Sequence, residues 1–173
     1  MAKTIKINLG SSDIDNAIKE LEKYEQEIKS KTDIFRKRLA EELRIEAQVL
    51  FDSAMIDDLV NGGGRSPSVS VTSSDSGDVS IIVADGEDAV WVEFGAGVYH
   101  NGSVGTSSHP RGVELGYTIG SYGKGYGKGR AWGYYDENRV LHITRGTPAT
   151  MPMYNATQSI INKAVSIARE VWK

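Results

Sequence analysis

The sequence predicts an α+β protein, with long helices packed on one face of a mostly antiparallel sheet. Segments 4–9 and 68–72 alternate apolar and polar residues, which is the period of a half-buried strand. Segment 79–84 has Val79, Ile81 and Val83 at every second position, which also predicts a strand. Segments 13–57 and 152–172 repeat apolar residues with the period of an amphipathic helix. Glycine-rich stretches separate the two kinds of segment, so the chain alternates between strands and helices.

The composition indicates one globular domain over residues 1–173. The chain is 39% hydrophobic and 25% charged, and its net charge of −3 argues against general nucleic-acid binding. It has no cysteine, which excludes disulfides, thiol nucleophiles and thiolate metal sites. No apolar run approaches the roughly 20 residues that span a bilayer, and no signal-peptide pattern opens the chain. We therefore expect a protein made in a cytoplasm, without a membrane partner.

The first predicted helix follows strand 4–9, with Ser11 or Ser12 as its cap. Segment 13–57 contains neither glycine nor proline. As one helix of about 45 residues it would reach roughly 65 Å, which exceeds a small domain. Because segment 30–33 offers a cap, we expect two helices or a sharp kink there.

A glycine-rich connector at 61–67 leads into the first predicted hairpin. Its strands are 68–72 and 79–84, and Val79, Ile81 and Val83 alternate with other residues along the second strand.

The apolar segment 88–97 carries one central charge, Glu93, and ends in Gly-Ala-Gly. Its residues 89–94 are too few to distinguish a strand from a short helix capped by Asp88. We expect Trp91, Val92 and Phe94 to be largely buried. We expect Glu93 to be a paired structural charge, because buried carboxylates persist mostly when they are hydrogen-bonded.

A glycine-rich insertion occupies about 98–138, and such a loop in a compact domain is usually functional or disordered. A second hairpin is predicted at 131–144, because this stretch is rich in aromatic and β-branched residues. Pro152 then begins the last helix, where its missing N–H costs nothing.

No motif predicts catalysis, a cofactor or a metal site. The run Gly123–Gly129 lacks both the phosphate-loop spacing and its strand–loop–helix context. The three histidines, His100, His109 and His142, have no partner at metal-ligand spacing on a predicted helix. A nucleophile elbow is also missing, although a Ser–His–Asp site on distant segments stays open.

One cluster of cations and aromatics suggests a contact surface. Such side chains on a glycine-rich strand suit the backbone of a nucleic acid or an acidic protein partner, although a merely soluble hairpin tip remains the alternative. The candidate contact residues are Tyr122, Lys124, Tyr126, Lys128 and Arg130.

Three motifs together resemble the tail-completion, or tail-terminator, proteins of tailed bacteriophages. They are Ala-Val-Trp-Val-Glu-Phe-Gly at 89–95, Arg-Gly-Thr-Pro at 145–148 and Pro-Met-Tyr-Asn-Ala at 152–156. In the family the last motif usually reads Pro-Phe-Leu-x-Pro-Ala, so this chain departs from it at two positions. The residues that carry the resemblance are Trp91, Glu93, Phe94, Gly95, Gly146, Pro148 and Pro152.

The resemblance implies a non-enzymatic virion component. Six copies would form a ring at the head-proximal end of a phage tail or a phage-derived tail-like particle, and would stop polymerisation of the tube. The partners would be other copies, the tail tube protein and a neighbouring neck or head-completion protein, with DNA in the lumen as a further candidate. The alternatives are a neck connector that contacts the portal or DNA and, from another class, a cell-wall hydrolase.

Overall fold

The α+β class is confirmed by the computed structural model, which describes residues 11–95, 107–112, 114–115 and 131–173. The predicted strand 4–9 lies outside these residues. The elements in chain order are α1 (Ser11–Ser53), β1 (Ser70–Ser76), β2 (Val79–Asp85), α2 (Ala89–Phe94), β3 (Trp132–Tyr135), β4 (Leu141–Thr144) and α3 (Pro152–Val171).

The first helix is continuous, so the predicted break at residues 30–33 is wrong. Helix α1 runs for 43 residues, which is about 64 Å at 1.5 Å per residue. Asp33, in the segment that offered a cap, instead pairs within the helix with Arg36 at 2.5 Å and Lys37 at 2.8 Å. A helix of this length is possible because α1 does not have to fit inside the body of the domain.

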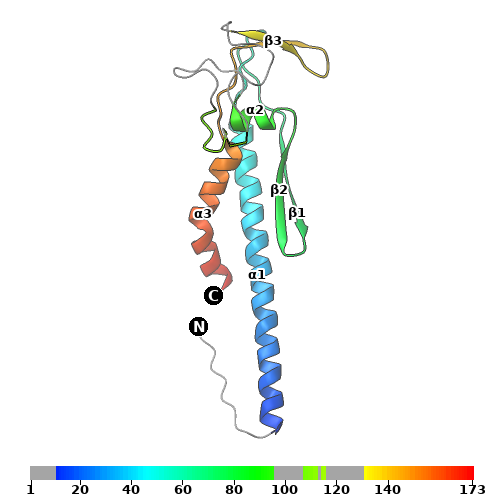
Figure 1. Ribbon diagram of the computed structural model, residues 1–173, viewed down its shortest axis with the longest axis vertical. Helices are drawn as coiled ribbons and strands as arrows, with labels where there is room; N and C mark the ends of the chain where they lie inside the picture. Colours follow the sequence, from blue (N-terminus) through cyan, green and yellow to red (C-terminus); the bar gives the residue numbers. More distant parts are fainter. Residues whose placement is uncertain (1–10, 96–106, 113, 116–130) are drawn as a thin grey trace.

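Only the C-terminal half of α1 is covered by other described elements. Figure 1 shows α3 on one side of α1 and the β1–β2 hairpin on the other, while the N-terminal half extends beyond both. Helix α3 runs antiparallel to α1. Trp172, just after α3, meets Phe35 of α1 with ring centroids 5.3 Å apart. Arg36 reaches Asp75 of the hairpin at 2.7 Å.

The described strands form two separate two-stranded antiparallel sheets, where the sequence predicted one sheet. Sheet β1–β2 lies along α1, and sheet β3–β4 lies at the opposite end of the molecule from the free end of α1 (Figure 1). The loop after α1 contacts the β3–β4 sheet, because the Leu59 N–H donates to the Ile143 carbonyl of β4 at 2.7 Å. Ile56 and Arg65 pair within this loop as an isolated bridge.

The core lies where α1, the β1–β2 hairpin, α2 and α3 meet. Its buried members are Ala47, Phe51, Ala54, Ile56, Val71, Val92 and Ala156. Strand β2 turns Ile82 and Ala84 towards this core. Val79, Ile81 and Val83 therefore face outward and are 46–58% exposed. Strand β2 is apolar on both faces, but α1 covers only one of them.

Among the described residues, no helix is both long enough and apolar enough to cross a membrane.

Candidate functional site

Glu93 lies at the centre of the region that joins α2 to α3. Its carboxylate accepts hydrogen bonds from the backbone N–H groups of Met153 at 2.8 Å and Tyr154 at 3.0 Å. These groups belong to the first turn of α3, where an α-helix leaves its N–H donors unpaired. The preceding residue, Met151, is left-handed (φ 57°) and caps nothing with its side chain. Glu93 therefore caps the N-terminus of α3, although it belongs to a distant segment of the chain.

His109 completes the environment of Glu93. Its Nδ1 accepts the Arg111 N–H at 3.0 Å, so Nε2 carries the proton and donates to Glu93 Oε1 at 3.1 Å. The ring lies 4.5 Å from the Phe94 ring and 5.3 Å from the Tyr154 ring, centroid to centroid. Both Glu93 and His109 are buried. Their hydrogen bonds occupy the carboxylate and both ring nitrogens, which suits a structural joint rather than proton transfer to a substrate.

A glycine allows the neighbouring chain segments to approach closely. Gly95 has φ 81°, and a Cβ there would lie 3.0 Å from the Ala149 nitrogen and 3.2 Å from the Thr147 oxygen. Thr150 N–H donates to the Val92 carbonyl at 2.9 Å. Segments 89–95 and 145–156 are thus one structural unit, which we call the α2–α3 joint.

Asp58 and His142 form a second buried polar cluster. His142 Nδ1 lies 2.7 Å from Asp58 Oδ2, and Nε2 lies 3.3 Å from Asp136 Oδ2. Asn61 adds a donor to Asp58 at 2.8 Å. Asn61 and His142 lower the pKa of Asp58 to about 2, and Asp58 chiefly raises the pKa of His142. Tyr134 stacks on the imidazole, with centroids 5.1 Å apart. This cluster holds the β3–β4 sheet to the loop after α1.

Arg65 and Asp88 form a third connection. The guanidinium donates to both carboxylate oxygens of Asp88, at 2.6 and 2.7 Å, and to the Tyr134 hydroxyl at 3.3 Å. This bidentate pairing chiefly raises the pKa of Arg65. Asp88 also accepts the Ser68 N–H at 2.8 Å and makes no side-chain cap to α2. Of the two alternatives for segment 89–94, the structure has the short helix, with Asp88 at its N-cap position. The Asp88 side chain does not cap α2, because Arg65 and Ser68 engage its carboxylate.

The residues behind the resemblance converge on the α2–α3 joint. Glu93 has the donors that the sequence predicted. Trp91 and Phe94 are only partly buried, whereas Val92 between them is completely buried. Pro152 is buried in the first turn of α3. Gly146 is buried with φ 111°, and Pro148 is exposed.

The predicted contact residues of the glycine-rich insertion lie outside the described residues, as does His100. Their role stays a prediction. The structure also brings together residues that the sequence did not single out, namely Asp58 with His142 and Arg65 with Asp88. The sequence held one signal for Asp58. It is the second of two adjacent acids, Asp57 and Asp58, that follow the long helix and the apolar residues 54–56.

Many large apolar side chains are exposed on the described surface, and three rows of them lie on different elements. One lies on the free half of α1, one is the outward row of β2, and one follows α3. Their members are Ile14, Ile18, Leu21, Tyr24 and Ile28 on α1, Val79, Ile81 and Val83 on β2, and Ile161, Val165 and Trp172 on or just after α3.

Comparison of the chain with protein-family models gives no match, and no curated protein or solved structure matches it significantly.

Proposed function

We propose that this chain is a non-enzymatic subunit of a ring that closes the head-proximal end of a phage tail or a phage-derived tail-like particle. The ring stops polymerisation of the tail tube and presents a surface to the next neck or head-completion protein. It is assembled in the bacterial cytoplasm and remains in the finished particle, with DNA in the lumen as a possible further contact.

The exposed apolar rows carry this proposal. Apart from Arg65 Nε, the buried polar groups described above have hydrogen-bond partners. Eleven large apolar side chains on α1, on β2 and on or just after α3 are nevertheless each 39–61% exposed. Large exposed apolar patches mark protein–protein contacts. A subunit with such surfaces on several sides suits an assembly in which each copy meets more than one neighbour.

The α2–α3 joint adds support, because the motif residues behind the resemblance act together there. Glu93 caps α3 beside Pro152, and Gly95 allows segment 145–150 to approach. The motifs thus have one shared structural purpose, which is to fix the start of α3 against α2. Glu93 and His109 also leave no ring nitrogen or carboxylate oxygen of the joint without a partner, which fits a structural role.

The test combines mass measurement with a tube assay. Light scattering after size exclusion gives the mass of the purified protein, and electron microscopy follows tail tubes that polymerise with and without it. We expect a closed multimer and tubes whose growth stops when it is added. A monomer at all concentrations, with no effect on tubes, contradicts the proposal. Binding to portal or head proteins but not to tubes indicates a neck connector instead, and cleavage of peptidoglycan indicates a hydrolase.

A further inference from the structure

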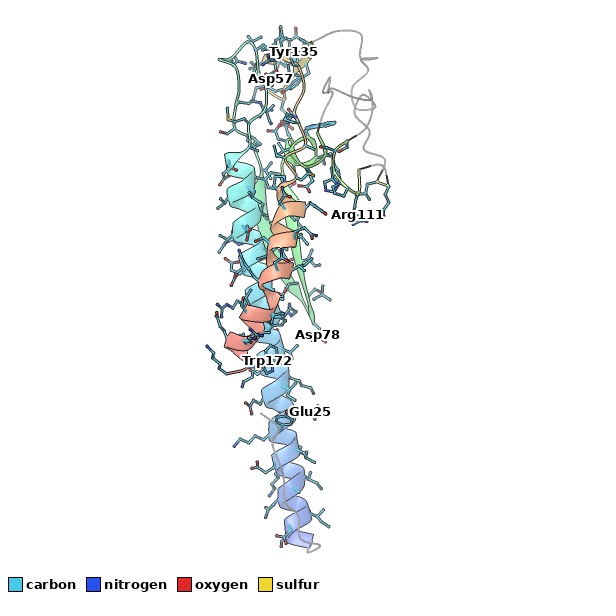
Figure 2. The ribbon with its side chains drawn as sticks, turned by 90° about the vertical axis from the view of Figure 1, so that its left-hand side faces the viewer. Glu25, Asp57, Asp78, Arg111, Tyr135 and Trp172 are labelled. Atoms are coloured by element: carbon cyan, nitrogen blue, oxygen red, sulfur yellow. The ribbon has the colours of Figure 1, made fainter. Side chains whose placement is uncertain are left out.

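The exposed row on α1 continues the face that α3 covers. Ile14, Leu21, Ile28 and Phe35 are spaced seven residues apart, so they lie on one side of the helix. Phe35 is covered, because its ring meets Trp172 at the end of α3. Figure 2 shows Glu25 on the part of α1 that lies beyond Trp172 and beyond Asp78 of the hairpin turn. The α1 row is therefore a helix-packing face that extends past the helix it packs against.

The charges beside the α1 row are mostly negative. Seen along the helix, Asp13, Glu20 and Glu27 follow one edge of the row, and Asp15 and Glu22 follow the other edge. Glu25 lies within the row itself. Lys29 and Lys31 pair with Glu25 and Glu27, at 2.6 and 3.1 Å, and offset part of this charge. Two α1 rows packed together would still place acids opposite acids, which disfavours that pairing. The complementary surface is an apolar row with basic flanks.

The two other exposed rows differ in their flanking charges. The β2 row has Asp78 before it and Asp85 at its end, so it repels the same acids. The α3 row instead has Arg169 beside it, which is exposed and makes no ion pair within the described part of the chain. Glu170, the acid of α3, lies on the flank that faces α1, where it pairs with Arg38 at 2.6 Å.

We propose that the α1 row of one copy packs against the α3 row of a neighbouring copy. The inference rests on the proposed function, in that it specifies which surfaces join the copies. Ile14, Leu21 and Ile28 would meet Ile161, Val165 and Trp172, with acids of α1 near Arg169. The two surfaces differ, so the contact is heterologous and each copy can bind one neighbour on either side. A closed ring needs this property.

Cysteine cross-linking tests the contact directly, because the chain has no cysteine of its own. Leu21→Cys and Val165→Cys are made as separate variants, mixed and oxidised mildly. We expect a disulfide-linked dimer that contains one copy of each variant, identified by mass spectrometry. The link must join two copies, because each variant has a single cysteine.

The matched control is Lys19→Cys mixed with Val165→Cys, because Lys19 lies on the opposite side of α1 from the row. This pair is expected to give at least tenfold less cross-linked dimer. Arg169→Glu in the cross-linking pair is expected to lower the yield further at low salt than at high salt. Equal yields from the test and control pairs, or links only between two Leu21→Cys copies, overturn the proposed contact.

Failure of this contact and failure of the proposed function are distinguishable. If the mixed cross-link forms but the protein leaves tube growth unchanged, the contact stands and the tail function fails. If tubes are capped by a ring in which the cross-link does not form, the function stands and the contact is wrong.

Discussion

Glu93 shows how one buried carboxylate can join two helices. Its charge is stabilised by the first N–H groups of α3, which have no partner within the helix, and by the positive end of the α3 dipole. His109 adds a further hydrogen bond. The sequence could predict that Glu93 has hydrogen-bond donors, because a single acid in an apolar segment needs them. It could not predict that the donors would be Met153 and Tyr154, which lie about sixty residues further along the chain.

Replacing Glu93 tests the joint. Glu93→Ala removes the cap and leaves buried donors unpaired, so we expect the free energy of unfolding to fall by about 2–4 kcal/mol. The control is Glu114→Ala, which removes an exposed acid paired with Arg111 and should cost less than about 1 kcal/mol. Urea unfolding measures both. Equal losses for the two variants would show that Glu93 is not a structural cap.

His142 makes stability depend on pH. Its pKa is raised above the ordinary 6.5, chiefly by Asp58, with Asp136 on the other ring nitrogen. The charged imidazole therefore stabilises the fold fully below about pH 6.5, and this stabilisation is lost as pH rises through the folded pKa. Asp58 and Asp136 have lowered pKa values, so they remain ionised throughout this range.

We expect the free energy of unfolding to fall between pH 6 and pH 9, and to fall less in His142→Gln, which cannot be protonated. His100 and His109 are unchanged in this variant, so the difference between the two pH profiles belongs to His142. Parallel profiles for the parent and the variant would contradict the role of the Asp58–His142 pair. The sequence could not predict this pair, because its members are 84 residues apart.

At the scale of elements, α1 has two halves with different roles. Its C-terminal half belongs to the core through Ala47 and Phe51, and its N-terminal half extends from the body. The sequence predicted the helical period correctly but not its continuity. Periodicity reports which residues share a face, and it does not report whether another element of the same chain covers that face.

Two proline substitutions compare how much each half of α1 contributes to the stability of the fold. Ser30→Pro breaks α1 before the elements that pack on it, so we expect the unfolding midpoint of the body to change little, even as helical circular dichroism falls. Arg44→Pro breaks the covered half and should cost about 3 kcal/mol or more. Tryptophan fluorescence in urea, at a concentration too low for association, follows the body. Similar losses for both variants would mean that the free half supports the fold of the single subunit.

Two substitutions near the end of α1 test the assigned core. Phe51 is 1% exposed and Val49 is 59% exposed. Phe51→Ala leaves a cavity and should cost about 3–5 kcal/mol, whereas Val49→Ala should change the free energy of unfolding by about 0.5 kcal/mol or less. Urea unfolding of the separated subunit measures both, and a large loss for Val49→Ala would place a further buried contact there.

At the scale of the whole molecule, the described chain is an elongated body with apolar rows on several sides. The fold class and the two hairpins could be predicted, because alternation and glycine positions are local signals. The separation into two sheets could not, because it depends on where α1 and its following loop place each hairpin. The sequence singled out Val79, Ile81 and Val83 on β2, but it could not show that they face outward. A strand that is apolar on both faces gives no signal for which face is covered.

The central claim is that the chain forms a ring at the head-proximal end of a tail. The most direct measurement is the position of the protein on finished particles, seen by electron microscopy with gold-labelled antibody. The account predicts label at the junction of head and tail, or at the corresponding end of a headless tail-like particle. Label along the tube, label at the distal tip, or particles without the protein would contradict it.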